Sequence, residues 1–354
     1  MKILIIQQKM IGDVLASSIL CDNLRKEYKN AQIDFMVYES TIAVLEGNTS
    51  IDNLIIFREK HRKSKWELLK FLFQIRKEKY DVVIDAYSKL ESWMVVAFSG
   101  AKQKISYFKK IINLLYTDTI PRTKTSDTNF GLIIDQRLDL LQPLNLKTDL
   151  DPFPKIVVTQ NEIDFADELF SSYGISRTKK TIMISIIGSE LKKTYPLQYM
   201  SKLIDFIANE SEVNLLFNYM PNQIEDATKI YEGCLKSTQE KIYFNVLGKN
   251  IRSFIAIMNN CDMIIGNDGG AINMAKALYK PSYIIFSPWI DKKGWATFED
   301  GTNNVSVHLA DYRPELFENQ NYKSLIKNAF NLYNEFKPSL VEPSLKKFLS
   351  IHLN

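Results

Sequence analysis

The chain opens with Lys2-Ile-Leu-Ile-Ile-Gln-Gln-Lys-Met-Ile-Gly-Asp-Val14, and this stretch decides the fold. The apolar run at residues 2–6 is typical of a strand buried in a parallel sheet. From residue 12 onward, apolar side chains recur with the spacing of one helix face, which predicts a helix over 12–27. A strand that leads through a tight turn into a helix is the first half of a βαβ unit.

The same alternation of short apolar runs and amphipathic stretches continues along the chain. Alternating strands and helices predict parallel sheets covered by helices. The further strands are expected at 32–37, 53–57, 81–85, 181–187, 213–218, 242–246, 262–266 and 282–286. The further helices are expected at 66–77, 161–173, 197–209, 222–235, 251–260 and 270–279. Prolines at 121, 143, 152 and 154 interrupt this rhythm and predict an interdomain linker near 152–160.

Two such series in a chain of 354 residues predict two α/β domains of ordinary size. We expect a first Rossmann-like domain over 1–155 and a second over 156–320. A C-terminal helical segment over 321–354 is expected to pack back on the first domain. Open α/β sheets bind ligands at the carboxyl ends of their strands, so the two domains are expected to face each other across a cleft lined by those edges.

Composition excludes several classes of protein. Hydrophobic residues make up 45% of the chain and charged residues 24%, which is the profile of a globular enzyme rather than a disordered or fibrous chain. A net charge of +4 is too small to predict nucleic-acid binding from charge alone. The three cysteines and three histidines lack the spacing of a zinc site. No apolar run of ~18 residues and no signal peptide is found, so a cytoplasmic protein is expected.

The turn after the first strand carries the first candidate site residues, Gly12 and Asp13. Gly12 permits close approach of the backbone to a ligand. Asp13 lies at or just inside the start of the predicted helix. An Asp at this point is equally well explained as a helix cap, because the N-terminal end of the helix dipole favours negative charge.

Two further segments follow strands of the second domain. Lys192 and Lys193 stand just before a helix expected to begin near Pro196, a position that suits a phosphate or diphosphate. The run Asp268-Gly-Gly-Ala-Ile-Asn273 joins a strand to an Ala-rich helix, and its glycines allow backbone N–H groups to face an anion. The alternatives are a solvated lysine pair and a structural turn capped by Asp268. No Gly-Lys-Ser/Thr follows, so this is not a Walker A loop.

Taken together, these segments resemble glycosyltransferase family 9, which includes the ADP-heptose:lipopolysaccharide heptosyltransferases. The opening through Ile-Gly-Asp13, the run Lys193-Thr-Tyr-Pro196 and the run Asp268–Asn273 match the family's motifs in the same order. Phe286-Ser-Pro288 and Gly294-Trp295 extend the resemblance to about residue 296. The resemblance implies the GT-B fold, with the acceptor-binding domain first and the nucleotide-sugar-binding domain second. Gly269 stands where the family has Thr, and Asn273 where it has His.

The resemblance further implies an inverting glycosyltransferase. It would move a heptose or related sugar from a nucleotide-diphosphate donor, with ADP-heptose favoured, to a lipopolysaccharide-type glycan. Asp13 corresponds to the general base and Lys193 to a group that stabilises the departing diphosphate. No metal or cofactor is required. The expected donor-binding residues are Lys192, Asp268, Gly269, Gly270, Ala271, Asn273 and Glu225. Glu225 is also explained as a helix-dipole residue, since it falls early in a predicted helix.

Basic side chains predict where the acceptor binds. Arg58, Lys60, Arg62 and Lys65 follow the third strand, and together with Gly12 they are the expected acceptor-binding residues. Lysines at 102, 104, 109 and 110 form a second basic region. Such clusters suit nucleic acid or a phosphorylated or acidic glycolipid at a membrane, and a merely solvated face explains them too. The family's acceptor favours the glycolipid, with transient contact at the inner face of the cytoplasmic membrane, no nucleic acid and a monomeric protein.

Two alternatives remain beside this interpretation. One is a GT-B transferase or epimerase that uses another nucleotide sugar. The other is a catalytically weak GT-B protein that binds glycolipid or nucleotide, for which the exchange of His for Asn273 is the relevant sign. Asp149 and Asp151 have the spacing of a metal-binding DxD motif but lie in the proline-rich linker, so they are expected to be solvated loop residues.

Overall fold

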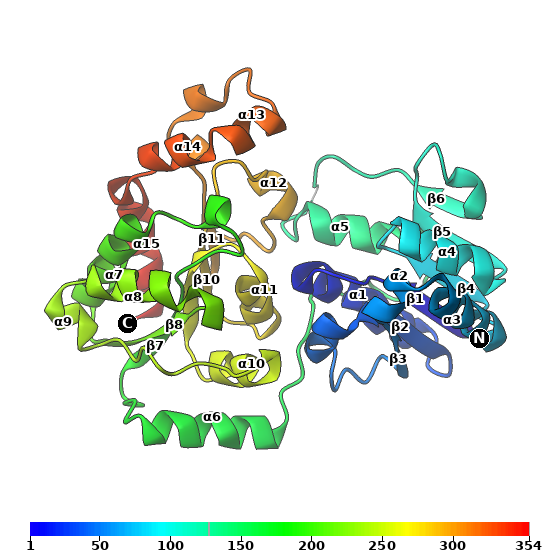
Figure 1. Ribbon diagram of the computed structural model, residues 1–354, viewed down its shortest axis with the longest axis horizontal. Coiled ribbons are helices and arrows are strands. Elements are labelled where there is room, and N and C mark those ends of the chain that lie inside the picture. The colour runs from blue at the N-terminus through cyan, green and yellow to red at the C-terminus, as the bar shows by residue number, and fades with distance from the viewer. Residues whose placement is uncertain (127, 354) are drawn as a thin grey trace. The chain divides into compact units, whose positions relative to one another are not determined.

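The computed structural model describes residues 1–126 and 128–353, and it divides the chain into two compact units, Met1–Val157 and Val158–Asn354 (Figure 1). The division falls close to the boundary expected between 155 and 156. In the described residues, no helix is both long enough and apolar enough to span a bilayer.

The first unit contains a six-stranded sheet in which every pair is parallel. Its strands, in spatial order, are β3 (Asn53–Phe57), β2 (Gln32–Tyr38), β1 (Lys2–Ile6), β4 (Val82–Asp85), β5 (Gln103–Tyr107) and β6 (Asp118–Ile120). Strand order reverses at β1, which pairs with both β2 and β4. Such a reversal opens a crevice at the carboxyl ends of the two central strands, where ligands bind in open α/β sheets.

Helices cover this sheet. They are α1 (Ile11–Glu27), α2 (Glu59–Lys63), α3 (Lys65–Glu78), α4 (Leu90–Ser99) and α5 (Leu132–Asp139), with 3₁₀ turns η1 (Glu39–Val44), η2 (Asn113–Leu115) and η3 (Gln142–Leu144). Helix α3 packs on α4, and α1 packs on α5. Leu4 and Val83, paired across β1 and β4, lie in one buried cluster with Phe71 of α3 and Val95 of α4. The apolar strand residues seen in the sequence therefore form the core, and the polar residues after each strand are left at its carboxyl edge.

The second unit contains a five-stranded parallel sheet. In spatial order its strands are β11 (Asn304–Val307), β10 (Ser282–Ile285), β9 (Met263–Asn267), β7 (Lys180–Ser185) and β8 (Val213–Asn218). The strand expected at 242–246 is reduced to one bridge between Ile242 and Leu215. The chain leaves the sheet there because Val246 N–H closes a turn on the Tyr243 carbonyl at 3.2 Å. The edge strand β11 was not predicted.

The helices of the second unit precede, connect and follow its strands. They are α6 (Gln160–Ser172), α7 (Leu197–Glu210), α8 (Ile224–Glu232), α9 (Lys236–Gln239), α10 (Ile251–Asn259), α11 (Gly270–Ala277), α12 (Lys292–Trp295), α13 (Tyr322–Lys327), α14 (Ala329–Glu335) and α15 (Pro338–His352). The 3₁₀ turns are η4 (Leu191–Lys193), η5 (Pro221–Gln223), η6 (Leu309–Asp311) and η7 (Pro314–Phe317).

The last helix, α15, belongs to the second unit, and the expectation that segment 321–354 packs on the first domain is wrong. Helix α15 lies against α7. Its buried side chains Leu345 and Phe348 join the core cluster that contains Tyr283 of β10. The Tyr283 hydroxyl also donates to the Val341 carbonyl at 3.3 Å. The apolar face of α15 is therefore buried in the core of the unit to which the helix belongs.

Candidate functional site

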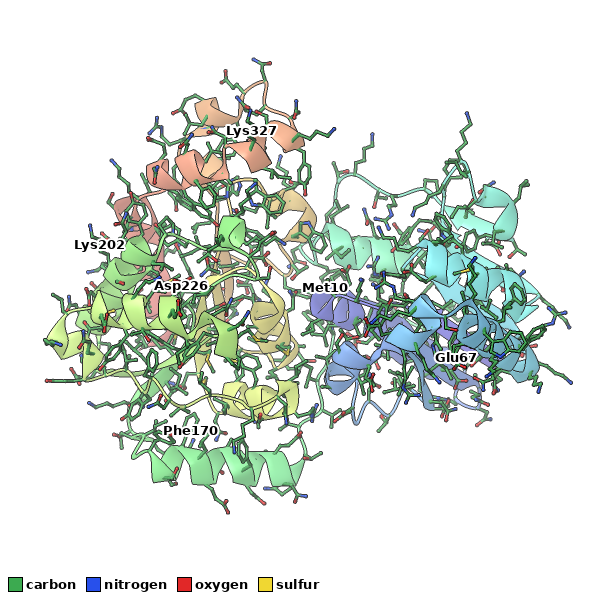
Figure 2. All side chains as sticks on the ribbon, viewed as in Figure 1. Met10, Glu67, Phe170, Lys202, Asp226 and Lys327 are labelled. Carbon is green, nitrogen blue, oxygen red and sulfur yellow. The ribbon has the colours of Figure 1, made fainter. Side chains whose placement is uncertain are left out.

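Asp13 is held by an ion pair rather than by the helix end. Helix α1 begins at Ile11, and its N-cap is Met10 (Figure 2). Met10 makes no side-chain cap bond. Asp13 therefore lies in the first turn without being the cap. Its Oδ1 accepts a hydrogen bond from Arg137 Nη2 at 3.0 Å, and its side chain is 21% exposed. Gly12 lies beside it in the same turn and is partly exposed.

Arg137 of α5 is buried and gathers several elements around Asp13. Its Nε donates to Ser17 Oγ at 2.7 Å, and its Nη1 donates to the Tyr107 hydroxyl at 2.6 Å. Its Nη2 also reaches Gln7 Oε1 at 3.4 Å. Burial acts to lower the pKa of Arg137, but Tyr107 and Asp13 more than offset it and raise that pKa above its usual value. We call Asp13, Arg137, Ser17, Tyr107 and Gln7 the Asp13 cluster. Sequence reasoning missed all of its members but Asp13.

A second group of polar residues lies at the carboxyl edge of the same sheet. Asp85, the last residue of β4, accepts bonds from Ser88 N–H at 2.8 Å and the Tyr116 hydroxyl at 2.7 Å. Burial raises the pKa of the Asp85 carboxyl. Lys109 Nζ donates to the Ser88 carbonyl at 2.6 Å. Within the described parts of the chain, both polar side-chain atoms of Gln8 are buried without a hydrogen-bond partner.

The basic segment predicted to bind the acceptor is anchored at His61. Its ring stacks on Phe71, and its Nδ1 accepts from the Arg58 N–H at 3.1 Å. Acidic neighbours engage part of the segment's charge: Lys60 pairs with Glu67 at 3.0 Å, and Arg62 Nε lies 3.4 Å from Glu91. The exposed Arg58 and Lys65 form no ion pair with any residue that the structure describes. Of the charges in this segment, these two are therefore the most available to a ligand.

In the second unit, Lys193 ends the 3₁₀ turn η4 that follows β7. Its Nζ lies 5.3 Å from the centre of the Trp289 ring and 3.9 Å from Glu190 Oε1. The Lys192 carbonyl accepts from Ser287 Oγ at 2.6 Å and from Trp289 Nε1 at 2.8 Å. The loop after β7 is thus tied to the loop after β10. The ring of Trp289 therefore lies beside the lysine pair.

Asn267 connects two segments: the turn that carries Lys192 and Lys193, and the turn at residues 268–273, which we call the glycine turn. Its Oδ1 accepts from the Tyr195 N–H at 2.7 Å, and its Nδ2 donates to the Ser185 carbonyl at 2.9 Å. Burial raises the pKa of the adjacent Asp268, against the opposing charges of Lys193 and Lys276. Two segments that the sequence treats separately are therefore brought to one edge of the sheet, and Asn267 is a positioning residue that sequence reasoning missed.

Helix α11 starts at Gly270, with Gly269 as its N-cap. A Cβ added at Gly269 would meet no atom within 4 Å, so the space where the family carries Thr is open here. Asn273 Nδ2 donates to the Gly269 carbonyl at 3.0 Å, which engages one end of its amide in the helix start. The N–H groups of Gly270 and Ala271 belong to the first turn and have no partner within the helix.

Glu225, predicted to contact the donor, is exposed in the first turn of α8. Its position fits the helix-dipole explanation. The neighbouring Gln223 is more firmly built into the edge of the sheet, because its Nε2 donates to the Gly188 carbonyl at 3.0 Å and its Oε1 accepts from Met220 N–H at 2.8 Å. Gly188 is itself required, since a Cβ there would collide with the Lys193 carbonyl.

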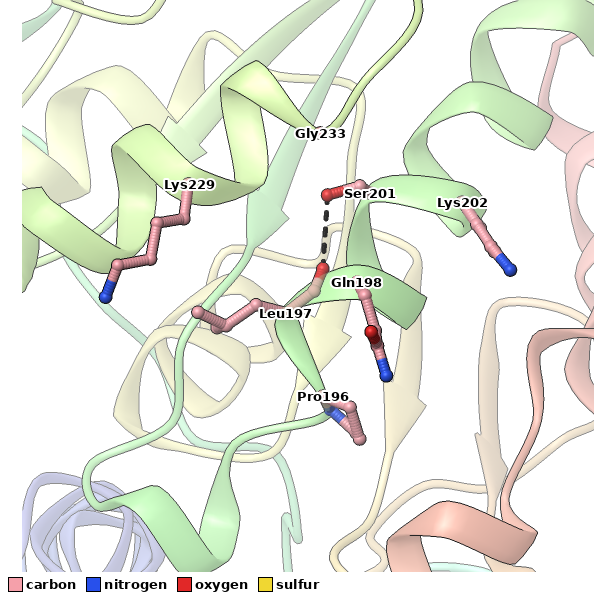
Figure 3. A pocket seen from close by; sticks show the side chains of 7 residues that line it. All are labelled: Pro196, Leu197, Gln198, Ser201, Lys202, Lys229 and Gly233. Carbon is pink, nitrogen blue, oxygen red and sulfur yellow. Dashed lines mark hydrogen bonds between the residues drawn. The ribbon is translucent and has the colours of Figure 1, made fainter.

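No metal site is recognised: in the described residues, three or more His, Cys, Asp or Glu side chains nowhere gather as metal ligands. Asp151 of the DxD pair bonds to Lys155 Nζ at 2.7 Å and to the Phe153 N–H at 3.1 Å, as a loop residue does. An open hollow of about 480 Å³ lies between α7 and α8 (Figure 3). Its lining is Pro196, Leu197, Gln198, Ser201, Lys202, Lys229 and Gly233, so it contains none of the predicted site residues.

Comparisons with known proteins identify the family. Residues 68–323 match glycosyltransferase family 9 (heptosyltransferase). Lipopolysaccharide heptosyltransferase 1 of Campylobacter coli is 25% identical over 348 residues, which cover 93% of this chain and 99% of that protein. Among solved structures, the family 9 glycosyl transferase of Veillonella parvula DSM 2008 has a TM-score of 0.78 at 19% identity, covering 98% of this chain and 97% of the other. The E. coli heptosyltransferase WaaC, solved with ADP-2-deoxy-2-fluoro heptose, has a TM-score of 0.65 at 16% identity, covering 95% and 99%.

These findings confirm the predicted family and the α/β GT-B fold. The opening stretch with Asp13 precedes the matched residues, whereas Lys193 and the glycine turn lie inside them. Because the match spans more than half of the 354 residues, this chain belongs to glycosyltransferase family 9, the heptosyltransferase family, and is a glycosyltransferase.

Proposed function

We propose that this protein transfers heptose, with inversion, from ADP-heptose to a lipopolysaccharide-type glycan. Family membership and the names of the relatives support the donor and acceptor class. The observation that carries the mechanism is Asp13, a partly exposed carboxylate held in one orientation by the buried Arg137. The test is to incubate the purified protein with ADP-heptose and a heptose-deficient lipopolysaccharide, and to measure ADP release and the mass of the glycan. Turnover of a UDP- or GDP-sugar, but not of ADP-heptose, would replace this proposal with the alternative donor.

Asp13 is the proposed general base. The acceptor hydroxyl must lose a proton as it attacks the anomeric carbon from the face opposite the leaving diphosphate. A carboxylate is a weak base for a sugar hydroxyl, so proton transfer lags behind C–O bond formation. Arg137 then acts as a positioning residue: it fixes the carboxylate through Oδ1 and makes no bond to Oδ2, the oxygen that we propose takes the proton.

The donor diphosphate is proposed to bind at the second unit. Lys193 and the N–H groups of Gly269, Gly270 and Ala271 supply positive potential where negative charge develops on the leaving group. Lys192 adds charge at longer range. Asp268 and Asn273 order the turn rather than contact phosphate, and Asn273 does so through its bond to the Gly269 carbonyl. Glu225 is proposed to accept a hydrogen bond from a ribose hydroxyl of the donor. The donor KM of a Glu225→Gln variant would test this role.

The acceptor is proposed to bind the first unit through Gly12 and the basic segment with Arg58, Lys60, Arg62 and Lys65. We place the protein in the cytoplasm as a monomer that touches the inner face of the membrane, where a lipid-linked acceptor is found, and we assign it no nucleic-acid partner. The exposure of the segment's arginines and lysines supports contact with the acidic groups of such a glycolipid.

Replacing Arg58, Arg62 and Lys65 together by Ala should raise the acceptor KM several-fold and leave the donor KM unchanged. The effect should shrink at high salt, because exposed charges are screened beyond about 8–10 Å. Initial rates at varied acceptor concentration, in low and high salt, measure it. The control replaces Lys202, Lys236 and Lys327, exposed lysines of the second unit, and should change neither KM. Equal shifts in both KM values would remove this segment from the acceptor site.

Replacing Arg137 by Met should lower kcat by roughly 10–10², because a small displacement of a reacting group is enough to cost that much. The KM for ADP-heptose should stay near wild type. Arg137→Lys should recover only part of the rate, because Lys keeps the positive charge beside Asp13 but cannot bond to all four partners of Arg137. Arg122 is the matched control: it stacks on the Tyr107 ring at 4.1 Å, as Arg137 approaches it at 5.8 Å, but it has no bond to Asp13. An Arg122→Met variant that loses kcat equally would trace the effect to Tyr107.

A further inference from the structure

The connection between β5 and β6 carries apolar side chains that the fold leaves in solvent. Ile111 is 96% exposed and Leu114 is 102% exposed, and Phe108 at the start of the connection is 52% exposed. Leu90, at the start of α4, is 63% exposed. Helix α4 packs against the η2 turn of this connection. An isolated exposed leucine needs no explanation, but several apolar side chains gathered in one short segment mark an interaction surface.

The core cluster of the first unit does not contain these exposed side chains. Ile112 and Leu115 point inward and pack with Trp93 on the core of the first unit. Two successive turns fix the alternation, because Ile112 N–H bonds to the Lys109 carbonyl at 3.0 Å and Leu115 N–H bonds to the Ile112 carbonyl at 3.0 Å. The same turns direct Ile111 and Leu114 outward. The inward apolar side chains of this segment contribute to the stability of the core. The outward ones do not, so their exposure needs another explanation.

Basic residues surround the exposed apolar ones. Lys110 lies between Phe108 and Ile111 in the sequence and is exposed. Lys109 Nζ bonds to the carbonyl of Ser88, the residue before Lys89, and Arg122 lies over the ring of Tyr107, so these cations share one region. The neighbouring carboxylates are engaged elsewhere: Asp85 is buried and Glu91 pairs with Arg62. The surface therefore combines protruding aliphatic tips with positive charge.

This connection begins at the Asp13 cluster. Tyr107 ends β5 and its hydroxyl accepts from Arg137, the partner of Asp13, whereas the next residue, Phe108, is already exposed. Lys109 then bonds to Ser88 beyond β4 at the same edge of the sheet. A ligand that covers the connection therefore lies next to the proposed acceptor site within the first unit.

We propose that residues 108–115, with Lys89 and Leu90, dock the protein on an anionic lipid surface; we call them the lipid-interface segment. Phe108, Ile111 and Leu114 enter the boundary between headgroups and acyl chains, and the flanking lysines meet lipid phosphates. Protruding aliphatic tips beside several cations fit a soft, anionic interface better than the flat complementary surface of a protein partner. The inference rests on the proposed function only in one respect, that a lipid-linked acceptor gives the docking a purpose.

Sedimentation with vesicles tests the proposal directly. The full-length protein should bind vesicles of phosphatidylethanolamine with phosphatidylglycerol, and bind vesicles of phosphatidylcholine alone more weakly. The double variant Ile111→Ser/Leu114→Ser should lose about tenfold or more in affinity, because each buried aliphatic side chain contributes that order of binding. Its melting temperature should stay near wild type. Leu235→Ser, at a leucine of the second unit that is 55% exposed, is the matched control and should bind as wild type does.

Charge and activity separate the remaining explanations. Lys110→Glu should weaken binding to the anionic vesicles alone, and added salt should reduce that difference. With a water-soluble acceptor glycan that lacks lipid, the double variant should keep wild-type kcat. Unchanged vesicle binding of the double variant, loss of activity on the soluble glycan, or a change of oligomeric state in the absence of lipid would each overturn the proposal. Vesicle binding is measured without donor or acceptor, so a failure of the proposed reaction leaves its result intact.

Discussion

Replacing Asp13 by Asn is expected to lower kcat by roughly 10²–10⁴, the usual contribution of a positioned general base. Asn has nearly the same size, and its Oδ1 can still accept the hydrogen bond from Arg137. What it lacks is the ability to take a proton from the acceptor hydroxyl. The KM for ADP-heptose should change little, since the proposed donor site is built from residues of the other unit. Initial-rate kinetics with both substrates measure the two effects separately.

The ion pair with Arg137 adds a stability effect that a capping residue would not show. Loss of the negative charge beside a buried guanidinium should cost about 1–3 kcal/mol of unfolding free energy, which lowers the melting temperature by a few degrees. Asp22→Asn, at a partly buried carboxylate of the same helix, is the control and should leave kcat unchanged. An Asp13→Asn variant that turns over at the wild-type rate would exclude Asp13 as the base.

Replacing Lys193 by Gln should lower kcat by roughly 10²–10³, as loss of one preorganised group does when it stabilises developing negative charge. Gln keeps a polar side chain of similar reach beside the Trp289 ring. It removes the positive charge that we propose stabilises the leaving diphosphate as the bond between the sugar and the phosphate breaks. The donor KM should rise far less than kcat falls, because the charge on the phosphate oxygens is greatest in the transition state.

The adjacent Lys192 provides the comparison for this variant. Lys192 stabilises the turn through its backbone carbonyl, which accepts hydrogen bonds from Ser287 and Trp289. Because Lys192→Gln leaves that carbonyl in place, the substitution should preserve the turn. We expect that variant to change kcat by less than about tenfold, as a charge at longer range would. Steady-state rates with ADP-heptose for the two variants decide the matter. Equal losses would mean that the pair supplies only general positive potential, and an unchanged kcat for Lys193→Gln would remove it from the mechanism.

Local sequence was enough to predict most elements of the two sheets. The strand at Lys2–Ile6 is a continuous apolar run, and the helix after it begins one residue before the predicted start at 12. Residues 242–246 have the apolar composition typical of a strand. Phe244 nevertheless packs against Tyr219 and Tyr231 in an aromatic group, and the segment does not form a strand of the sheet. A pattern of apolar residues predicts which side chains are buried. It does not predict whether the backbone forms hydrogen bonds with a neighbouring strand.

The candidate site could be predicted from the sequence where its residues lie close together along the chain. Lys193 and the turn at Asp268 stand out because each follows a strand. Arg137 does not, because it is one basic residue on a short helix, and its partners Ser17 and Asp13 lie 120 and 124 positions earlier. Asn267 escaped notice for the same reason, since its bond to Tyr195 spans 72 positions. Contacts of this kind join residues that are far apart in the sequence and form only in the tertiary structure. The local sequence around each residue therefore does not predict them.

The place of α15 in the core of the second unit also sets the order in which the two units are completed during synthesis. The strands and helices of the first unit are all present once α5 has left the ribosome, and domains generally fold as units, with the N-terminal one first. The second unit lacks part of its core until Leu345 and Phe348 emerge, so Tyr283 has no complete cover before then. A nascent chain stalled before residue 338 should therefore hold a folded first unit and a second unit that chaperones still recognise.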